Sequence, residues 1–348
     1  MSSLSERIIL FKKCGGGYGG TVLTPLDGYF PIPAAYFGMV LGIIGMGSAW
    51  RFAAAHWALP ALAGECLMAL GVAVWLVLAC VFIYKWLFRR AAALAEVRDP
   101  IQCCFISLFP GTTMLVGVAV APYAKPLAFW LIVLGTVGQL AFAAYRSAGL
   151  WRGRHTPEAT TPGVYLPTVA SNLISAIALG SLGYGHWGFL FLGAGIFSWL
   201  SLEPVILARL RTLGELPKPV RPTIGIQLAP PLVACTAYLS VNGGVANIFA
   251  QVLFGYGMLQ LIFLARLLVW TFEQPFSSSF WSFSFGVSAM STSALRFLVH
   301  DPGSPIALLS WLIFIFSNLV HRTFDRRHAG PHFSRQISAP PSGSGPAA

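Results

Sequence analysis

The sequence predicts an all-α integral membrane protein, with ten transmembrane helices forming five helical hairpins in a quasi-five-fold arrangement around a central pore. Hydrophobic residues make up 56% of the 348 residues and charged residues only 9%, about a third of the charged share of a soluble chain. Apolar segments long enough to cross a bilayer recur along the chain. The basic residues cluster between these segments. A water-soluble domain of this size has no room to bury so much apolar surface.

Ten segments reach the length of about 20 mostly apolar residues that a membrane-spanning helix requires. Short connections follow the first, third, fifth, seventh and ninth segments, so consecutive segments pair as hairpins. The ten segments are 33–52, 62–87, 102–122, 126–149, 164–184, 187–210, 224–242, 246–271, 279–299 and 304–322.

Lysine and arginine predict the orientation of these segments. Loops rich in these residues stay in the cytoplasm. Of the 22 basic residues, 19 lie at one end of the predicted spans, and Arg51, Lys125 and Arg296 lie at the other. We therefore expect both termini in the cytoplasm. The net charge of +11 is distributed over these loops rather than along one stripe, which argues against a nucleic-acid partner.

The two helices of each predicted hairpin differ in composition. Odd-numbered segments are rich in small residues and contain helix breakers, as in SLFPGTTMLVGVAVAP at 107–122, whereas even-numbered segments are bulkier, as in LMALGVAVWLVLACVFIYKWLF at 67–88. Breaks free backbone groups that lipid cannot satisfy, so we expect the odd segments to form an inner ring. Small residues that merely allow close helix packing are the alternative. Repetition through five hairpins favours the common axis.

The motifs YFGMVLGIIGMGSAW, GTVGQLAF, FLGAGIFSWLSLEPVIL and WSFSFGVSAM follow one another along the chain. In this order they resemble the tellurite-resistance/dicarboxylate transporter family, whose plant relatives are the slow-type anion channels of guard cells. The resemblance covers about residues 30–325. It departs from the family at Ala34 and Ala35, where threonine–glycine is the family pattern.

The resemblance implies a homotrimer in the lipid bilayer of the bacterial inner membrane. Each subunit would have its own pore, lined by the five odd helices and passing small inorganic monovalent anions. The channel domain would span 31–325, between cytoplasmic tails at 1–30 and 326–348. The second tail is rich in proline, serine and glycine and is expected to be disordered.

By the same resemblance, Phe285 of the ninth segment is the gate and Gly38 lies at the pore. Gly286 follows the gate residue, where the backbone is able to bend. Phe283 is roughly 200° away around a regular helix, so the two rings cannot both face the pore. A hydrophobic ring across a narrow pore stops ions by steric block and by dewetting.

Neutral polar groups are the expected anion ligands, because the central portions of segments 3, 5, 7 and 9 contain no charged residue. Proton-coupled transporters and cation channels commonly use carboxylates there. Each hydroxyl has an alternative role, a hydrogen bond to the carbonyl four residues earlier. The candidate pore-lining residues are Gly38, Gly42, Thr112, Thr113, Ser171, Asn172, Thr236, Ser288 and Ser291.

Glu203 in the sixth segment and Arg266 in the eighth are expected to be structural charges, held by a salt bridge or by exposure at the membrane interface. Gating or coupling is the alternative for Glu203. Histidines and cysteines lack metal-site spacing, so we expect no metal and no cofactor. No base–nucleophile pair supports an enzyme. The leading function is an anion channel, and the alternative is a secondary transporter of C4-dicarboxylates or tellurite-type oxyanions, which should have fixed cationic groups near mid-membrane.

Overall fold

The computed structural model describes residues 32–153, 155–275 and 277–328, and every regular element in these ranges is helical. The tails expected at 1–30 and 326–348 lie outside the described residues, apart from the last turn of the final helix. The long helices are α2 (Phe37–Trp57), α3 (Ala61–Phe88), α5 (Leu108–Val120), α6 (Lys125–Leu150), α7 (Ser171–Ser181), α8 (Gly185–Thr212), α9 (Ala229–Val241), α10 (Ile248–Thr271), α11 (Ser282–His300) and α13 (Ser310–His328).

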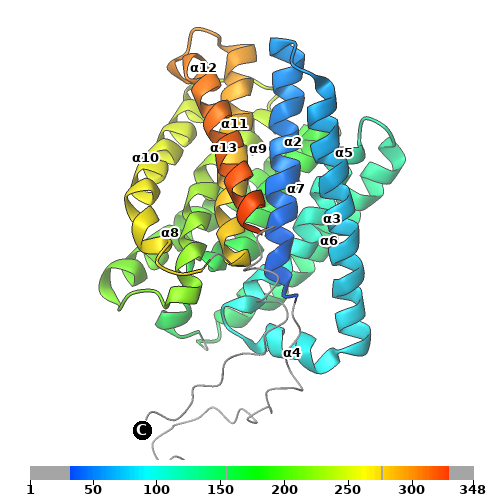
Figure 1. The fold of residues 1–348 in the computed structure, drawn as a ribbon. Helices are drawn as coiled ribbons and strands as arrows, with labels where there is room; N and C mark the ends of the chain where they lie inside the picture. Colours follow the sequence, from blue (N-terminus) through cyan, green and yellow to red (C-terminus); the bar gives the residue numbers. More distant parts are fainter. Residues whose placement is uncertain (1–31, 154, 276, 329–348) are drawn as a thin grey trace, which may run out of the picture.

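These helices pack as successive hairpins (Figure 1). The partners are α2 with α3, α5 with α6, α7 with α8, α9 with α10, and α11 with α13. The first helix of each hairpin also contacts the first helices of two other hairpins. Helix α2 contacts α5, α5 contacts α7, α7 contacts α9, α9 contacts α11, and α11 returns to α2. The contacts therefore form a closed cycle.

Burial separates an inner from an outer set of helices. Eight helical segments in the described ranges are long and apolar enough to cross a membrane, so the chain is a multi-pass membrane protein. Along the chain, the first, third, fifth and seventh of them are 61–89% buried, and the second, fourth, sixth and eighth only 22–28%. The outer helices expose large apolar side chains, among them Leu76, Val137, Phe197 and Ile262. Such a surface is suited to lipid.

The last two predicted spans, 279–299 and 304–322, are helical but are not among these eight. Helix α11 carries six serine and threonine residues together with Arg296, and α13 ends in a charged sequence. These polar groups lower the mean hydropathy of both helices. Helix α11 is nevertheless mostly buried, against α2 and α9.

Each inner helix begins with a segment that is wound differently from an α-helix. The 3-10 segments are η1 (Ala34–Tyr36) before α2, η2 (Gln102–Ser107) before α5, η4 (Pro162–Val164) upstream of α7, η6 (Lys218–Leu228) before α9 and η7 (Ser278–Trp281) before α11, and the π-type segment η5 (Leu166–Ala170) leads directly into α7. Most of their residues are buried within the protein. This agrees with the helix breakers in the odd segments, because irregular backbone at membrane depth is tolerated where protein surrounds it.

A buried ion pair fixes the short helix α4 (Arg90–Arg98) beneath the bundle. Lys85, near the end of α3, pairs with Glu96 of α4, and both side chains are buried. The Glu96 carboxylate also accepts the backbone N–H of Ala34 at 2.6 Å. One carboxylate therefore ties the start of the first inner helix to α3 and α4.

Candidate functional site

Two cavities lie among the inner helices, and the same five helices contribute to both. The larger has a volume of about 360 Å³ and is lined by residues late in these helices, including Ser48, Pro122, Ser181 and Arg296. The smaller, of about 30 Å³, is lined by residues at their starts, including Gly38, Leu166 and Ser282. The smaller one has room for no more than a few water molecules. The cavities therefore lie toward opposite ends of the bundle.

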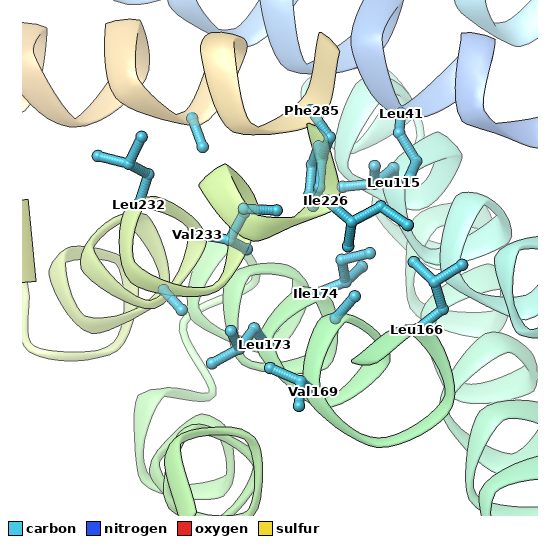
Figure 2. Close-up of a cluster of buried hydrophobic side chains, with 14 of the residues drawn as sticks. Leu41, Leu115, Leu166, Val169, Leu173, Ile174, Ile226, Leu232, Val233 and Phe285 are labelled. Atoms are coloured by element: carbon cyan, nitrogen blue, oxygen red, sulfur yellow. The ribbon is translucent and has the colours of Figure 1, made fainter. Parts of the chain in front are cut away.

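Phe285 is the one described residue that lines both cavities. Its side chain is buried, with 7% of the residue exposed. Figure 2 shows the ring projecting from α11 toward Leu41 of α2, Leu115 of α5 and Ile226 of η6. These neighbours come from three other parts of the ring of helices. The aromatic ring thus contributes to the lining of both cavities, one toward each end of the bundle.

The glycine beside Phe285 serves packing. A Cβ on Gly286 would lie 2.9 Å from Cβ of Leu228 and 3.1 Å from the backbone nitrogen of Ala229. Both distances are shorter than an ordinary contact, so the absent side chain allows α11 to approach the start of α9 closely. Phe283 is on another face of α11, where its ring packs against Gly225 of η6. Only one of the two rings lines the cavities.

Of the candidate pore-lining residues, Gly38 lines the smaller cavity, and Thr236 and Ser288 line the larger. The Thr236 hydroxyl donates to the carbonyl oxygen of Leu232 at 3.0 Å, and the Ser288 hydroxyl donates to that of Phe285 at 3.0 Å. Both side chains therefore present oxygen lone pairs to the cavity rather than free protons.

The other six candidates do not line either cavity. Thr112 and Thr113 donate to the carbonyl oxygens of residues 108 and 109 at 2.7 and 2.8 Å, the role that the sequence analysis kept as the alternative. Ser171 donates to the carbonyl oxygen of residue 166 at 2.8 Å. The Asn172 side chain accepts a hydrogen bond from Gln139 of α6 at 3.2 Å.

The remaining two candidates lie where helices meet. A Cβ on Gly42 would lie 2.6 Å from Cβ of Ser284, so this glycine brings α2 against α11. The Ser291 hydroxyl is buried and has no hydrogen-bond partner within the described ranges.

Glu203 and Arg266 lie in different surroundings. The Glu203 carboxylate accepts hydrogen bonds from the hydroxyls of Tyr165 and Tyr256 and, at 2.9 Å, from the Trp199 indole. These bonds join α8 to α10 and to Tyr165, which also lines the smaller cavity. No ion pair to Glu203 forms in the part of the chain that the structure describes. Arg266 is exposed on α10.

Two arginines line the larger cavity, and the sequence analysis did not assign either to the site. Arg51 lies late in α2 and Arg296 late in α11, at the end of the spans where the sequence analysis expected only three basic residues. The sequence did contain one clue to these arginines, because lysine and arginine are rare at this end of the predicted spans. The Arg51 guanidinium pairs with both carboxylate oxygens of Glu65, at 2.8 and 2.7 Å, and donates to the carbonyl oxygen of Ala119 at 2.9 Å.

Arg296 is held differently. Its guanidinium carbon lies 4.7 Å from the centre of the Phe52 ring. Its Nε is buried without a hydrogen-bond partner, and no carboxylate of the described residues pairs with it. The cavity lining contains no aspartate or glutamate. The larger cavity therefore contains one arginine whose charge is not neutralised.

Tyr123 lies outside the membrane-spanning segments and contacts the Arg51–Glu65 pair. Its hydroxyl donates to the Glu65 carboxylate at 2.6 Å. This hydrogen bond raises the pKa of Tyr123, because loss of the proton would leave two negative oxygens in contact. The carboxylate is thus held between Tyr123 and the guanidinium of Arg51.

Comparison with known proteins gives one matching family and several relatives. The family described as voltage-dependent anion channel (SLAC1) matches residues 31–321. The chain is 39% identical over 292 residues to the tellurite resistance protein TehA homolog of Haemophilus influenzae, covering 84% of this chain and 88% of that one. It is 24% identical over 320 residues to the guard cell S-type anion channel SLAC1 of Arabidopsis thaliana, covering 86% of this chain and 56% of the plant protein.

Proposed function

Because the chain belongs to the SLAC1 family of voltage-dependent anion channels, we propose that it is an anion channel that passes small monovalent inorganic anions. The family contains anion channels and transporters and not enzymes. The relative from Arabidopsis is named as an anion channel, although this chain spans only about half of its length. The geometry of the inner helices is the independent argument for a channel.

The pore that we propose runs through each subunit between α2, α5, α7, α9 and α11. Three observations support it: the closed cycle of contacts among these helices, their burial, and a cavity toward each end. In this proposal α11 and α13 are the ninth and tenth spans. The many hydroxyl groups of α11 suit a helix that faces a pore and neighbouring helices better than a helix that faces lipid. The five hairpins then surround the pore with quasi-five-fold symmetry.

Phe285 is the gate in this proposal, and the observation that carries it is that Phe285 alone lines both cavities. A permeating anion would have to pass the ring. The groups around it are apolar, among them Leu41, Leu115 and Ile226 (Figure 2). An anion that gives up its hydration there gains no ligand, so the ring blocks by size and by excluding water. Gating requires the ring to move aside.

For the assembly, we propose a homotrimer in the bacterial inner membrane with both termini in the cytoplasm. The start of α2 and the end of α13 lie toward the same end of the bundle (Figure 1). The smaller cavity is at the starts of the inner helices, which is the cytoplasmic side in this orientation, and the Arg296 cavity faces outward. The concentration of basic residues at the cytoplasmic end supports this orientation.

A secondary transporter of C4-dicarboxylates or tellurite-type oxyanions is the second candidate. The relative named for tellurite resistance favours it, and so do the two arginines at the larger cavity. Arg51 is already neutralised by Glu65, however, so the cavity offers one free positive charge to a dianion.

The test is anion current through the protein in oocytes or planar bilayers, wild type beside Phe285→Ala. We expect a small wild-type current and a much larger, anion-selective current in the variant, because the ring between the cavities is removed. Phe283→Ala is the matched control, since it removes the same side chain from another face of the same helix. If neither the wild type nor Phe285→Ala carries current, and the wild type takes up labelled malate in a saturable way, the transporter replaces the channel.

A further inference from the structure

The larger cavity contains a group that the gate does not explain, the cationic side chain of Arg296. Its Nε is buried without a hydrogen-bond partner. A buried polar group without a partner costs about 1–3 kcal/mol, and more when it is charged. A bound ion is one of the explanations for a buried polar group without a partner. This guanidinium faces a cavity of about 360 Å³.

The other polar groups of the lining are already committed to the protein. The hydroxyls of Ser48, Ser181 and Thr292 donate to the carbonyl oxygens of residues 44, 178 and 288, at 3.1, 2.7 and 3.0 Å. Thr236 and Ser288 donate in the same way. A ligand in this cavity therefore meets oxygen lone pairs, apolar groups and two arginines, of which Arg51 is already paired with Glu65 and Arg296 is not.

Charge compensation predicts the ligand. Arg51 and Glu65 cancel each other through two short contacts, and no carboxylate lines the cavity. The net charge of the lining is therefore +1, which one monovalent anion neutralises. A divalent oxyanion would leave an uncompensated negative charge in an apolar site, at a high desolvation cost.

The position of the guanidinium suits a weakly hydrated anion. Its carbon lies 4.7 Å from the centre of the Phe52 ring, a cation–π arrangement that holds one face of the group. Its N–H groups remain available in the plane of the guanidinium, where planar anions are bound by two hydrogen bonds. Nitrate matches this geometry and loses its hydration at lower cost than sulfate.

From these observations we infer that the Arg296 guanidinium and the cavity next to Phe285 form a binding site for one weakly hydrated monovalent anion, such as nitrate. The site deepens the proposed function, because it names the class of anion that the protein binds. The binding itself does not depend on the proposed function, but the statement that the site belongs to an ion pathway does. When Phe285 blocks the pore, the anion is bound in the larger cavity next to the ring. The ring of Phe285 then separates a bound anion from the smaller cavity.

The binding test uses the full-length purified protein and the midpoint of its thermal unfolding. Nitrate is titrated at constant ionic strength, with gluconate as the balancing anion. A ligand that binds only the folded state raises the midpoint in a saturable way. We expect saturable stabilisation by nitrate and no comparable effect of sulfate. A linear response without saturation in the wild type would overturn the site.

Three variants locate the site. Arg296→Met should weaken nitrate binding about tenfold or more, because a charge-assisted hydrogen bond is lost. Arg296→Lys should keep part of the affinity, since the charge remains without the planar fork. Arg266→Met is the matched control, because Arg266 is exposed on α10, and it should bind like the wild type. Unchanged saturation in Arg296→Met would place the anion elsewhere and overturn the inference.

A second measurement does not depend on a variant that folds. Diffraction from wild-type crystals grown in bromide should give an anomalous peak within hydrogen-bond distance of Arg296. Bromide found only at other positions would overturn the site. Currents through Phe285→Ala keep the two proposals apart. Nitrate binding without current refutes the channel and keeps the site, and current without binding does the reverse.

Discussion

Replacing Gly42 by alanine is expected to destabilise the protein, although the change adds a single methyl group. A Cβ at this position would lie 2.6 Å from Cβ of Ser284 in α11 and 3.4 Å from Nε2 of His321 in α13. Two carbon atoms in contact prefer a separation of about 3.5–4.0 Å. The Cβ of Ser284 is attached to the backbone and cannot rotate away. Helix α11 would therefore have to move outward by about 1 Å.

Overpacking of this kind costs about 1–3 kcal/mol in a well-packed interior. The assay is thermal unfolding of the detergent-solubilised protein, followed by size-exclusion chromatography of what remains folded. We expect the Gly42→Ala midpoint to fall by several degrees. Gly255→Ala in α10 is the control, because a Cβ there meets nothing within 4 Å. Ser284→Gly in the Gly42→Ala background should restore the midpoint by removing the opposing carbon.

The result also distinguishes two positions for Gly42. If Gly42→Ala melts like Gly255→Ala, the close contact between α2 and α11 does not exist. In that case Gly42 would face open space, as its assignment as a pore-lining residue expects. Failure of Ser284→Gly to rescue would equally refute the contact.

Three further predictions concern the smaller cavity, the buried ion pair and the loop after α6. Gly38→Asp should abolish the current of the unplugged variant described above, because it introduces a side chain and a negative charge into a cavity of about 30 Å³; normal current from well-expressed protein would contradict this position. Lys85→Met should lower stability by about 3–5 kcal/mol by leaving Glu96 buried and uncompensated, and thermal unfolding should show that Lys85→Met with Glu96→Gln recovers most of it, since glutamine still accepts the Ala34 N–H. Burial lowers the pKa of His155, so its loop should be fully stable above about pH 6.5 and lose stability as the pH falls below that value, where the unfolded chain takes up the proton first. Hydrogen exchange of residues 155–163, measured above and below about pH 6.5, should show this loss in the wild type. An equal loss in His155→Gln would contradict the prediction.

The spans were predictable from sequence because the bilayer sets their length. The segment expected at 62–87 is observed as Ala61–Phe88, and that expected at 126–149 as Lys125–Leu150. The helix breakers in the odd segments indicated irregular backbone, and the structure places several of them at the starts of the inner helices. Pro167, for example, lies in the π-type segment before α7. Proline removes a backbone donor and cannot continue a regular helix.

The rotation of each helix about its axis was not predictable in this way. Thr112 and Thr236 are the same residue type in similar segments, yet only Thr236 lines a cavity. The rotation follows from particular contacts between helices, such as that of Gly42 with Ser284. The sequence places Arg296 late in its segment, but its contact with Phe52, which is distant in sequence, could not be predicted from the segment itself.

The closed cycle of contacts has a consequence for the chain itself. In a linear stack of hairpins the first and last have special positions, but here α2 contacts α11 as well as α5, so no hairpin is terminal. The ends of the described chain lie toward one end of the bundle (Figure 1), the end that also holds the connections after α3, α6, α8 and α10. The contacts in the cycle therefore do not determine which hairpin contains the chain ends. A circular permutant opened between α6 and α7, with the native ends joined by a flexible linker, would preserve every contact in the cycle. The opening belongs at residues 151–153, the exposed start of that connection, because new termini are tolerated best in exposed segments.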